Sequence, residues 1–241
     1  MTKTLDTRQV INRETDFCKA SCVRFFQPIS EGAEPLDPDA RMLYLLSMRS
    51  AFKEWVIVVD ALARGEQIVI FRKGGLREGR DGFQVEHPEF WLFPTLFHQQ
   101  RESVIPEAQA RFDELAPNFP AANVLRLEAF ARVVAWHRLE DLKDAQRLQG
   151  QHIWRDNVIA ERFDWRRSKQ IHALAVRVFR LPKAVELPML PSYGGCKSWI
   201  EIEEDVATLG AVPALDDAAF QAKLAAFQSA LSPIENHAGV I

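Results

Sequence analysis

Apolar residues follow two different spacings along the chain, and the change between them predicts where helices and strands lie. Over residues 50–64 they recur at the spacing of an amphipathic helix, and Gly65 stands where a C-terminal cap glycine belongs. The β-rich run from Trp55 to Val59 is also compatible with a strand. We favour a helix because the apolar face extends to Leu62.

Elsewhere the pattern predicts strands with helices between them. Apolar runs predict strands over residues 67–71, 82–95 with an irregularity at Pro88, 124–139, 173–181, 185–188 and 196–202. Helical spacing predicts helices over residues 37–49, 95–104, 105–120, 140–154 and 216–231, the last with Phe220, Leu224, Phe227 and Leu231 on one stripe. We therefore expect an α+β fold, with a mixed or antiparallel sheet or a small barrel and flanking helices.

Proline and glycine punctuation divides the chain into three parts. Residues 1–36 are predicted to be a peripheral N-terminal extension, because prolines and glycine interrupt them. Residues 37–210 are predicted to form a single α+β domain, and residues 211–241 a C-terminal amphipathic helix and tail. The total of 241 residues is enough to bury a substantial core.

Composition and charge narrow the class of protein. The chain has a net charge of −3 and only three cysteines, which argues against a disulfide framework and favours a reducing cytoplasm. Its N-terminus lacks the apolar stretch of a signal peptide, and its longest apolar run is too short to cross a bilayer. We expect a soluble cytoplasmic protein without a membrane partner. Any nucleic-acid binding must come from a local basic patch.

A basic glycine turn follows the predicted strand 67–71. Arg72 and Lys73 supply positive charge, and Gly74 and Gly75 would let the backbone approach an anion closely. The stretch matches neither a P-loop nor a dinucleotide-binding glycine motif. It is therefore either a grip for phosphate or the solvated tip of a hairpin.

Two histidines flank the apolar run that follows. His87 and His98 would act as base and acid, with Glu54 and Glu86 as carboxylate partners and Gln99 as a further ligand contact. They would also suit two positions of a metal site, but the sequence names no third ligand, and the pair Cys18 and Cys22 has no matching second pair. A structural role for each histidine is the alternative. The sequence does not identify a cofactor.

A second basic stretch interleaves cations with aromatic residues. A surface of this kind suits a single strand or a flipped base, and its alternative is a set of core aromatics beside a solvated loop. The candidate patch is Arg162, Trp165, Arg166, Arg167 and Lys169. The order of predicted elements from residue 131 to 188 resembles small barrels of the pseudouridine-synthase-and-archaeosine-transglycosylase (PUA) type, which is an analogy of fold alone.

Several of these motifs together resemble a bacterial and archaeal family, catalogued as domain-of-unknown-function family 1802, over about residues 51–202. Its N-terminal pattern is carried by Phe52-Lys53-Glu54-Trp55, Gln67, Arg72-Lys73-Gly74-Gly75, Glu86-His87, Phe93-Pro94-Thr95 and His98-Gln99. Its C-terminal pattern is carried by Phe163-x-Trp165 and Tyr193-Gly194-Gly195-Cys196-x-Ser198-Trp199. The resemblance implies no activity, but it favours a functional role for the basic turn.

Three functions remain open from the sequence. The first is a nucleic-acid or nucleotide-binding module that uses the basic glycine turn. The second is an enzyme that acts on a phosphate-containing substrate with histidine as acid and base. The third is a protein-interaction or regulatory subunit. We expect residues 67–99 to build the functional face.

Overall fold

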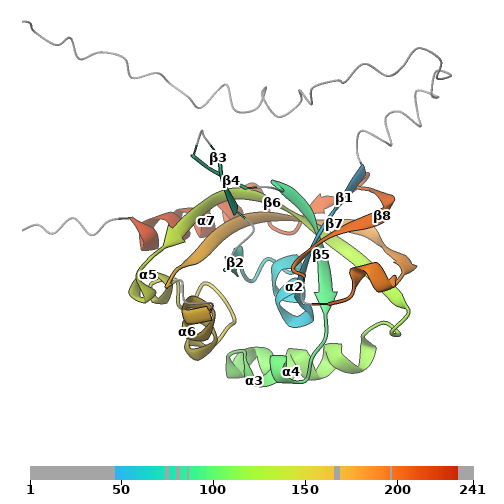
Figure 1. Cartoon of the computed structure of the whole chain (residues 1–241), viewed down its shortest axis with the longest axis horizontal. Helices are drawn as coiled ribbons and strands as arrows, with labels where there is room; N and C mark the ends of the chain where they lie inside the picture. The colour runs from blue at the N-terminus through green and yellow to red at the C-terminus, as the bar shows by residue number, and fades with distance from the viewer. Residues whose placement is uncertain are drawn as a thin grey trace, which may run out of the picture. The chain divides into compact units, whose positions relative to one another are not determined.

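A mixed β-sheet forms the centre of the molecule (Figure 1). The computed structural model describes residues 47–73, 76–79, 82–85, 87–165, 169–195 and 197–232. Within these ranges the strands follow the order β2-β7-β6-β5-β1-β8, with β9 beside β7, and the pair β1 and β5 is parallel. The strands are β1 Ser47–Trp55, β2 Val69–Arg72, β5 Glu89–Thr95, β6 Val124–Leu139, β7 Ile171–Pro188, β8 Trp199–Ala207 and β9 Val212–Pro213.

The two longest strands, β6 and β7, arch over the rest of the sheet (Figure 1). Their antiparallel register shifts between Leu127 and Ala129 and again between Val133 and Ala135, and such bulges bend a strand pair. The sequence predicted two strands where β7 is one. Pro182 does not end it, because this proline falls in the unpaired stretch at the first shift, where no ladder hydrogen bond is required.

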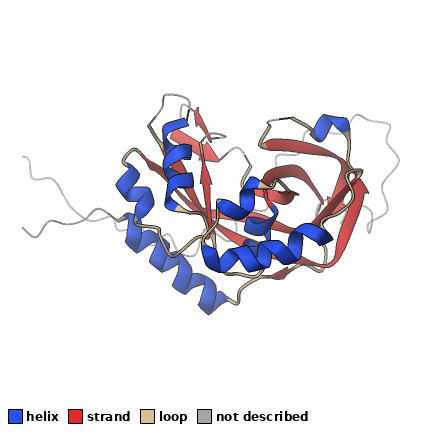
Figure 2. Cartoon of the chain, turned by 90° about the horizontal axis from the view of Figure 1, so that it is seen from below, coloured by secondary structure: helices blue, strands red, loops and turns tan. Residues whose placement is uncertain are grey.

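Helices cover one face of the sheet, as Figure 2 shows from the side of α3 and α4. They are α2 Val56–Ala63, α3 Gln99–Glu102, α4 Pro106–Leu115, α5 Leu142–Gln146, α6 Asp156–Asp164 and α7 Asp217–Leu231. The stripe Phe220, Leu224, Phe227 and Leu231 of α7 is buried in the larger core, as predicted. A smaller core around Trp91 and Phe130 lies on the other face of the sheet, since Phe90 and Leu92 alternate into the larger one. The α+β class, with a mixed sheet and flanking helices, is confirmed.

The segment from residue 47 to 65 differs from its prediction. Residues 47–55 form β1, and the helix begins only at Val56. The apolar spacing suggested a helix from residue 50, but β1 pairs with β5 on one side and β8 on the other, and this pairing overrides the spacing. The predicted cap at Gly65 is correct, because this glycine has a φ of +71°.

The segment after β2 also differs from the hairpin considered from the sequence. β2 pairs with β7, not with the strand that follows it in the chain. Strands β3 Leu76–Gly79 and β4 Gly82–Val85 form a separate two-stranded sheet. The helix predicted over residues 95–104 is shorter, because Thr95 belongs to β5 and α3 begins after His98. The predicted N-terminal extension, residues 1–36, lies outside the described residues, and the division into domains stays a prediction.

The side chain of Arg72 lies between the two edges of the sheet. It ends β2, the first strand in the sheet order, and its guanidinium carbon lies 4.2 Å from the ring centre of Phe52 on β1. The same atom lies 5.2 Å from the ring of Trp199 on β8, the last strand in that order. The sheet therefore curls toward a barrel, and within the described residues no backbone pairing joins its end strands β2 and β8. No helix within the described ranges is long and apolar enough to cross a membrane.

Candidate functional site

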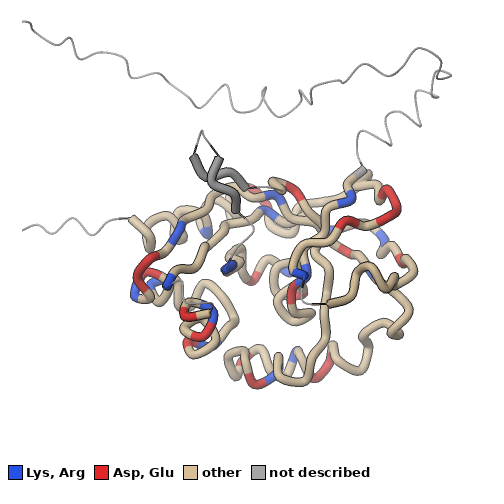
Figure 3. Tube along the Cα trace, viewed as in Figure 1, with Lys and Arg blue, Asp and Glu red and all other residues tan. Residues whose placement is uncertain are grey.

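A cleft of about 640 Å³ lies where the ends of β1 and β2 meet α6. Its size is within the range of about 300–1,000 Å³ that is usual for ligand sites. Its lining includes five basic residues and two acidic ones, and Figure 3 shows basic positions beneath the arch of the sheet. The charged residues are Lys53, Arg72, Lys73, Arg162 and Lys197 with Glu54 and Glu161, and the aromatic ones are Phe52, Trp55, Phe71, Phe97 and Trp165.

Glu54 is held at the junction between β1 and α2. Its Oε1 accepts a hydrogen bond of 2.8 Å from the backbone N–H of Trp55, the residue that caps α2. Its backbone carbonyl accepts a hydrogen bond of 3.0 Å from the hydroxyl of Thr95, at the end of the parallel neighbour β5. These contacts fix both the carboxylate and the chain that carries it.

The Glu54 side chain is buried, with 5% of its surface exposed, and it is the one buried carboxylate among the described residues. Burial raises its pKa, because a charged carboxylate loses its hydration there. The positive charges of Arg162 and Arg72 act in the opposite direction. Arg162 Nη2 lies 3.9 Å from Glu54 Oε1, which is an ion pair but too long for a hydrogen bond.

Two guanidinium groups in the cleft rest on aromatic rings. Arg72 lies over Phe52, and burial lowers its pKa to about 10, so it is still charged at neutral pH. Arg162 lies 4.9 Å from the ring of Trp55 and 5.0 Å from that of Trp154. Cation–π contacts of this kind hold a charge in place without using its hydrogen-bond donors.

Lys73 is fastened to the backbone of the neighbouring segment. Its ammonium donates to the carbonyl of Phe163, near the end of α6, and to the carbonyl of Gln170, 3.0 Å away, just before β7. A cation is favourable at a helix C-terminus, where the last carbonyls lack partners. Lys73 therefore joins β2 to the segment that carries Trp165, which differs from the solvated hairpin tip considered from the sequence.

The rim of the cleft exposes two large aromatic side chains. Phe97 is 59% exposed and Trp165 is 62% exposed, and both line the cleft. Lys197 also lines the cleft and is exposed, whereas Lys53 donates a hydrogen bond of 3.2 Å to the carbonyl of Gly195. Exposed aromatic rings beside cations form a surface on which a flat group can stack.

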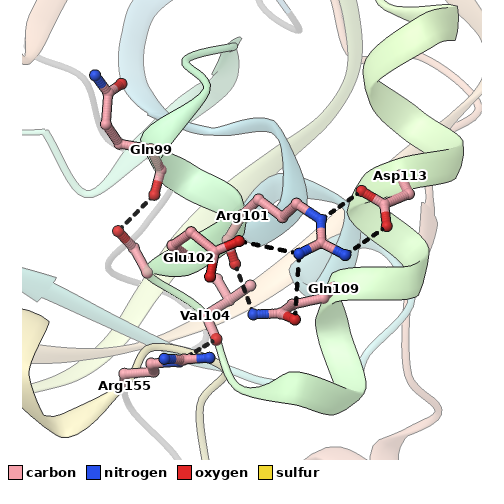
Figure 4. A network of polar contacts seen from close by, with 8 residues as sticks. Gln99, Arg101, Glu102, Val104, Gln109, Asp113 and Arg155 are labelled. Atoms are coloured by element: carbon pink, nitrogen blue, oxygen red, sulfur yellow. Dashed lines mark hydrogen bonds and ion pairs between the residues drawn. The ribbon is translucent and has the colours of Figure 1, made fainter.

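A polar network fixes the part of the chain between Phe97 and α6 (Figure 4). Arg101 makes two hydrogen bonds to the carboxylate of Asp113, which join α3 to α4. Arg155, at the start of α6, donates to the carbonyl of Val104, and its backbone N–H donates to the carbonyl of Ser103. Ser103 itself lines the cleft. This network therefore supports one wall of the cleft from outside.

The structure brings together part of the residue set predicted from the sequence. Glu54, Arg72, Lys73, Arg162 and Trp165 all line the one cleft, although they come from three separate regions of the chain. Five further candidates lie outside the described residues: Glu86, Gly74, Gly75, Arg166 and Arg167.

Four predicted residues do not line the cleft: His87, His98, Gln99 and Lys169. The ring of His87 lies 4.8 Å from that of Trp199, and its Nδ1 lies 3.1 Å from the hydroxyl of Ser50. His98 caps α3 and is exposed, as are Gln99 and Lys169. A catalytic or ligand-binding role for these residues stays a prediction.

Several lining residues were not singled out from the sequence. Lys53 and Trp55 adjoin Glu54 in the family pattern, and Lys197 lies within its C-terminal part. Their place in the family pattern could have marked these three residues as site candidates. Phe97 had no such signal, because an exposed phenylalanine and a core phenylalanine look the same in a sequence. Within the described ranges, no group of His, Cys, Asp and Glu side chains is arranged to hold a metal ion.

Comparison with known proteins gives a family and a distant structural likeness. The family model described as Domain of unknown function (DUF1802) matches residues 51–226. None of the curated proteins matches the chain. The crystal structure of ASCH from Zymomonas mobilis is similar at 12% identity and a TM-score of 0.37, covering 73% of this chain and 92% of that chain. A mutant of that protein is similar at 11% identity and a TM-score of 0.37, covering 73% and 95%. A likeness at this level implies nothing further about the cleft.

Proposed function

The chain belongs to the family described as Domain of unknown function (DUF1802), and we propose that its cleft binds single-stranded nucleic acid. One observation carries this proposal. A chain with a net charge of −3 gathers five basic residues and exposed aromatic rings around one cleft. Positive charge concentrated in this way on an acidic protein favours an anionic ligand at that place.

The aromatic residues favour nucleic acid over a simple anion. Sulfate or phosphate alone would gain nothing from Phe97 and Trp165, which expose most of their surface at the rim. A base has a flat π-face that stacks on such rings, while its backbone phosphate lies near the cations. A single strand fits better than a duplex, because only unpaired bases offer their faces.

The experiment is a binding titration by fluorescence anisotropy. The full chain is mixed with labelled single-stranded RNA, single-stranded DNA and the matching duplexes, at salt concentrations from about 50 to about 200 mM. We expect single strands to bind more tightly than duplexes, with an affinity that falls steeply as salt rises. Absence of binding to single strands, or binding that does not depend on salt, would contradict the proposal. Competition by free mononucleotides tests whether one nucleotide unit is sufficient.

Trp165→Ala tests the rim with a side chain whose removal leaves the core intact. Loss of one base-stacking ring should weaken binding by about fivefold to about 150-fold. Leu209→Ala is the matched control, because Leu209 is 56% exposed and does not line the cleft. Equal effects of the two substitutions would mean that the rim has no part in binding.

We advance no acid–base reaction at this cleft. The hypothesis of an enzyme depended on His87 and His98, and neither histidine is among the residues that line it. A binding function accounts for the charge and the rings without a chemical step.

A further inference from the structure

The cleft holds a buried carboxylate that an anionic ligand would not be expected to need. The positive charges of Arg162 and Arg72 act on Glu54, and they would attract phosphate more strongly without it. Its burial is unfavourable, because a charge that leaves water needs compensating partners. Arg162 compensates this charge only in part, because the closest atoms of the two side chains are 3.9 Å apart. A ligand in the cleft would therefore supply the hydrogen-bond donors that the Glu54 carboxylate lacks.

The carboxylate has hydrogen-bonding capacity toward the cleft. Its hydrogen bond from Trp55 and its ion pair with Arg162 both involve Oε1. No described residue donates a hydrogen bond to Oε2. A carboxylate offers about four lone-pair positions on its two oxygens. Glu54 can therefore accept two further N–H donors from a group that enters the cleft.

The chemistry of the four bases distinguishes which of them would supply these donors. On its Watson–Crick edge guanine carries two adjacent donors, N1–H and N2–H, followed by the acceptor O6. Cytosine and adenine carry one exocyclic amine there, and uracil carries one N–H between two carbonyls. A carboxylate beside a guanidinium matches the guanine sequence of donor, donor and acceptor, because Arg162 stands next to Glu54.

We propose that Glu54 makes the cleft selective for guanine, by accepting hydrogen bonds from the N1–H and N2–H of a guanine base. This proposal rests on the proposed function and names its base. Arg162 is placed to donate to O6 of the same base. A positively charged ligand would also satisfy the carboxylate, but the surrounding cations oppose it.

The test changes one base in an otherwise constant strand. Labelled short uridine strands with guanosine, cytidine, adenosine or uridine at the central position are titrated with the full chain. We expect the guanosine strand to bind about tenfold or more tightly than the all-uridine strand, with cytidine second. Equal affinities, or a preference for another base, would overturn the selectivity while leaving the proposed function standing. No binding of any strand would overturn both.

Altered bases test the same contact without changing the protein. Inosine lacks the N2 amine of guanine, so it should bind about tenfold to about 150-fold less tightly, which is the value of one hydrogen bond to a charged group. 7-Deazaguanosine keeps the Watson–Crick edge and should bind like guanosine. Inosine that binds as tightly as guanosine would disprove the role of N2–H.

Glu54→Gln tests the protein side of the contact. We expect the ratio of guanosine-strand to uridine-strand affinity to fall toward one, because an amide offers a single acceptor oxygen. A ratio measured in one preparation does not depend on how much of the protein is folded. Glu128→Gln, at an exposed position of β6 outside the cleft, is the matched control and should keep the full ratio. A full ratio in Glu54→Gln would overturn the proposal.

Discussion

Arg101 and Arg162 are both arginines beside a carboxylate, but their surroundings differ. Arg101 makes hydrogen bonds of 2.7 and 2.9 Å to Asp113 and one of 3.0 Å to Glu102, and its side chain is 40% exposed (Figure 4). Arg162 is 24% exposed, and its nearest carboxylate oxygen, on Glu54, is 3.9 Å away. No hydrogen bond joins Arg162 to another described residue, and two indole rings flank it.

The difference separates a structural use of charge from one that leaves room for a ligand. In the network on α3 and α4 each charge is satisfied by its neighbour, so the pKa of Asp113 is lowered by the hydrogen bonds from Arg101. In the cleft, burial acts against both charges, raising the pKa of Glu54 and lowering that of Arg162. Charges that are kept in such a place, with donors and acceptors left over, are typical of functional sites.

Arg162→Met should have the largest effect on stability. Removing one partner of a buried ion pair leaves the other uncompensated, which costs about 3–5 kcal/mol in the free energy of unfolding. Urea denaturation followed by circular dichroism measures it. Arg101→Met is the comparison, and we expect it to change the unfolding midpoint far less, because exposed ion pairs contribute little. Similar losses in both variants would erase the distinction between the two regions.

The double variant Arg162→Met with Glu54→Gln sharpens this prediction. If the loss in Arg162→Met comes from an uncompensated carboxylate, neutralising Glu54 should recover part of it. The two changes would then be non-additive in a double-mutant cycle. Strict additivity would mean that the lost packing against Trp55 and Trp154 explains the whole effect.

Lys73→Met should have the next largest effect. The ammonium donates to two backbone carbonyls, those of Phe163 and Gln170, so its removal should cost about 1–3 kcal/mol. Lys223 is the control, because its ammonium donates to a single carbonyl, that of Glu66, at an exposed position. Chemical denaturation compares the two. If Lys73→Met is as stable as Lys223→Met, the lysine does not fasten α6 to β2.

Much of the fold was readable from spacing alone, because long strands and an amphipathic helix carry strong periodic patterns. β6 and α7 lie where apolar alternation and the stripe from Phe220 to Leu231 predict them. The stretch from residue 50 to 55 was not readable, since its apolar spacing suits a helix and only its two neighbouring strands make it β1. Local pattern cannot include partners that are distant in the sequence.

The residues of the candidate site could in part be predicted from the sequence, but their arrangement in space could not. Arg72 and Arg162 were singled out in two separate stretches, as a phosphate grip and as part of a nucleic-acid patch. No pattern in the sequence links these two stretches, because the cleft depends on the curl of the sheet that brings Arg72 of β2 against Phe52 of β1. The histidines stood out for their chemistry, yet sequence proximity to Arg72 did not bring them into the lining.

Glu54→Gln should change how stability depends on pH. The folded protein raises the pKa of Glu54 above the ordinary value of 4.5, so it holds this proton more tightly than the unfolded chain does. Wild-type stability therefore falls as pH rises through the interval between the two pKa values. Gln cannot titrate, so the melting temperature of the variant should gain on that of the wild type as pH rises above about 4.5. A difference in melting temperature that stays constant with pH would show that burial does not raise the pKa of Glu54.

Lys197→Ala should have the smallest effect, and it addresses how the exposed cations of the cleft act. Lys197 is exposed at the rim, so its loss should leave the free energy of unfolding unchanged within about 0.5 kcal/mol. If it contacts one phosphate, the slope of log affinity against log salt should become shallower by about 0.7, equivalent to about fivefold weaker binding near 0.1 M salt. Lys183→Ala, at an exposed position of β7 outside the lining, is the matched control and should leave the slope as it is. An unchanged slope in Lys197→Ala would confine phosphate contacts to the cations deeper in the cleft, where Arg72 and Arg162 rest on aromatic rings.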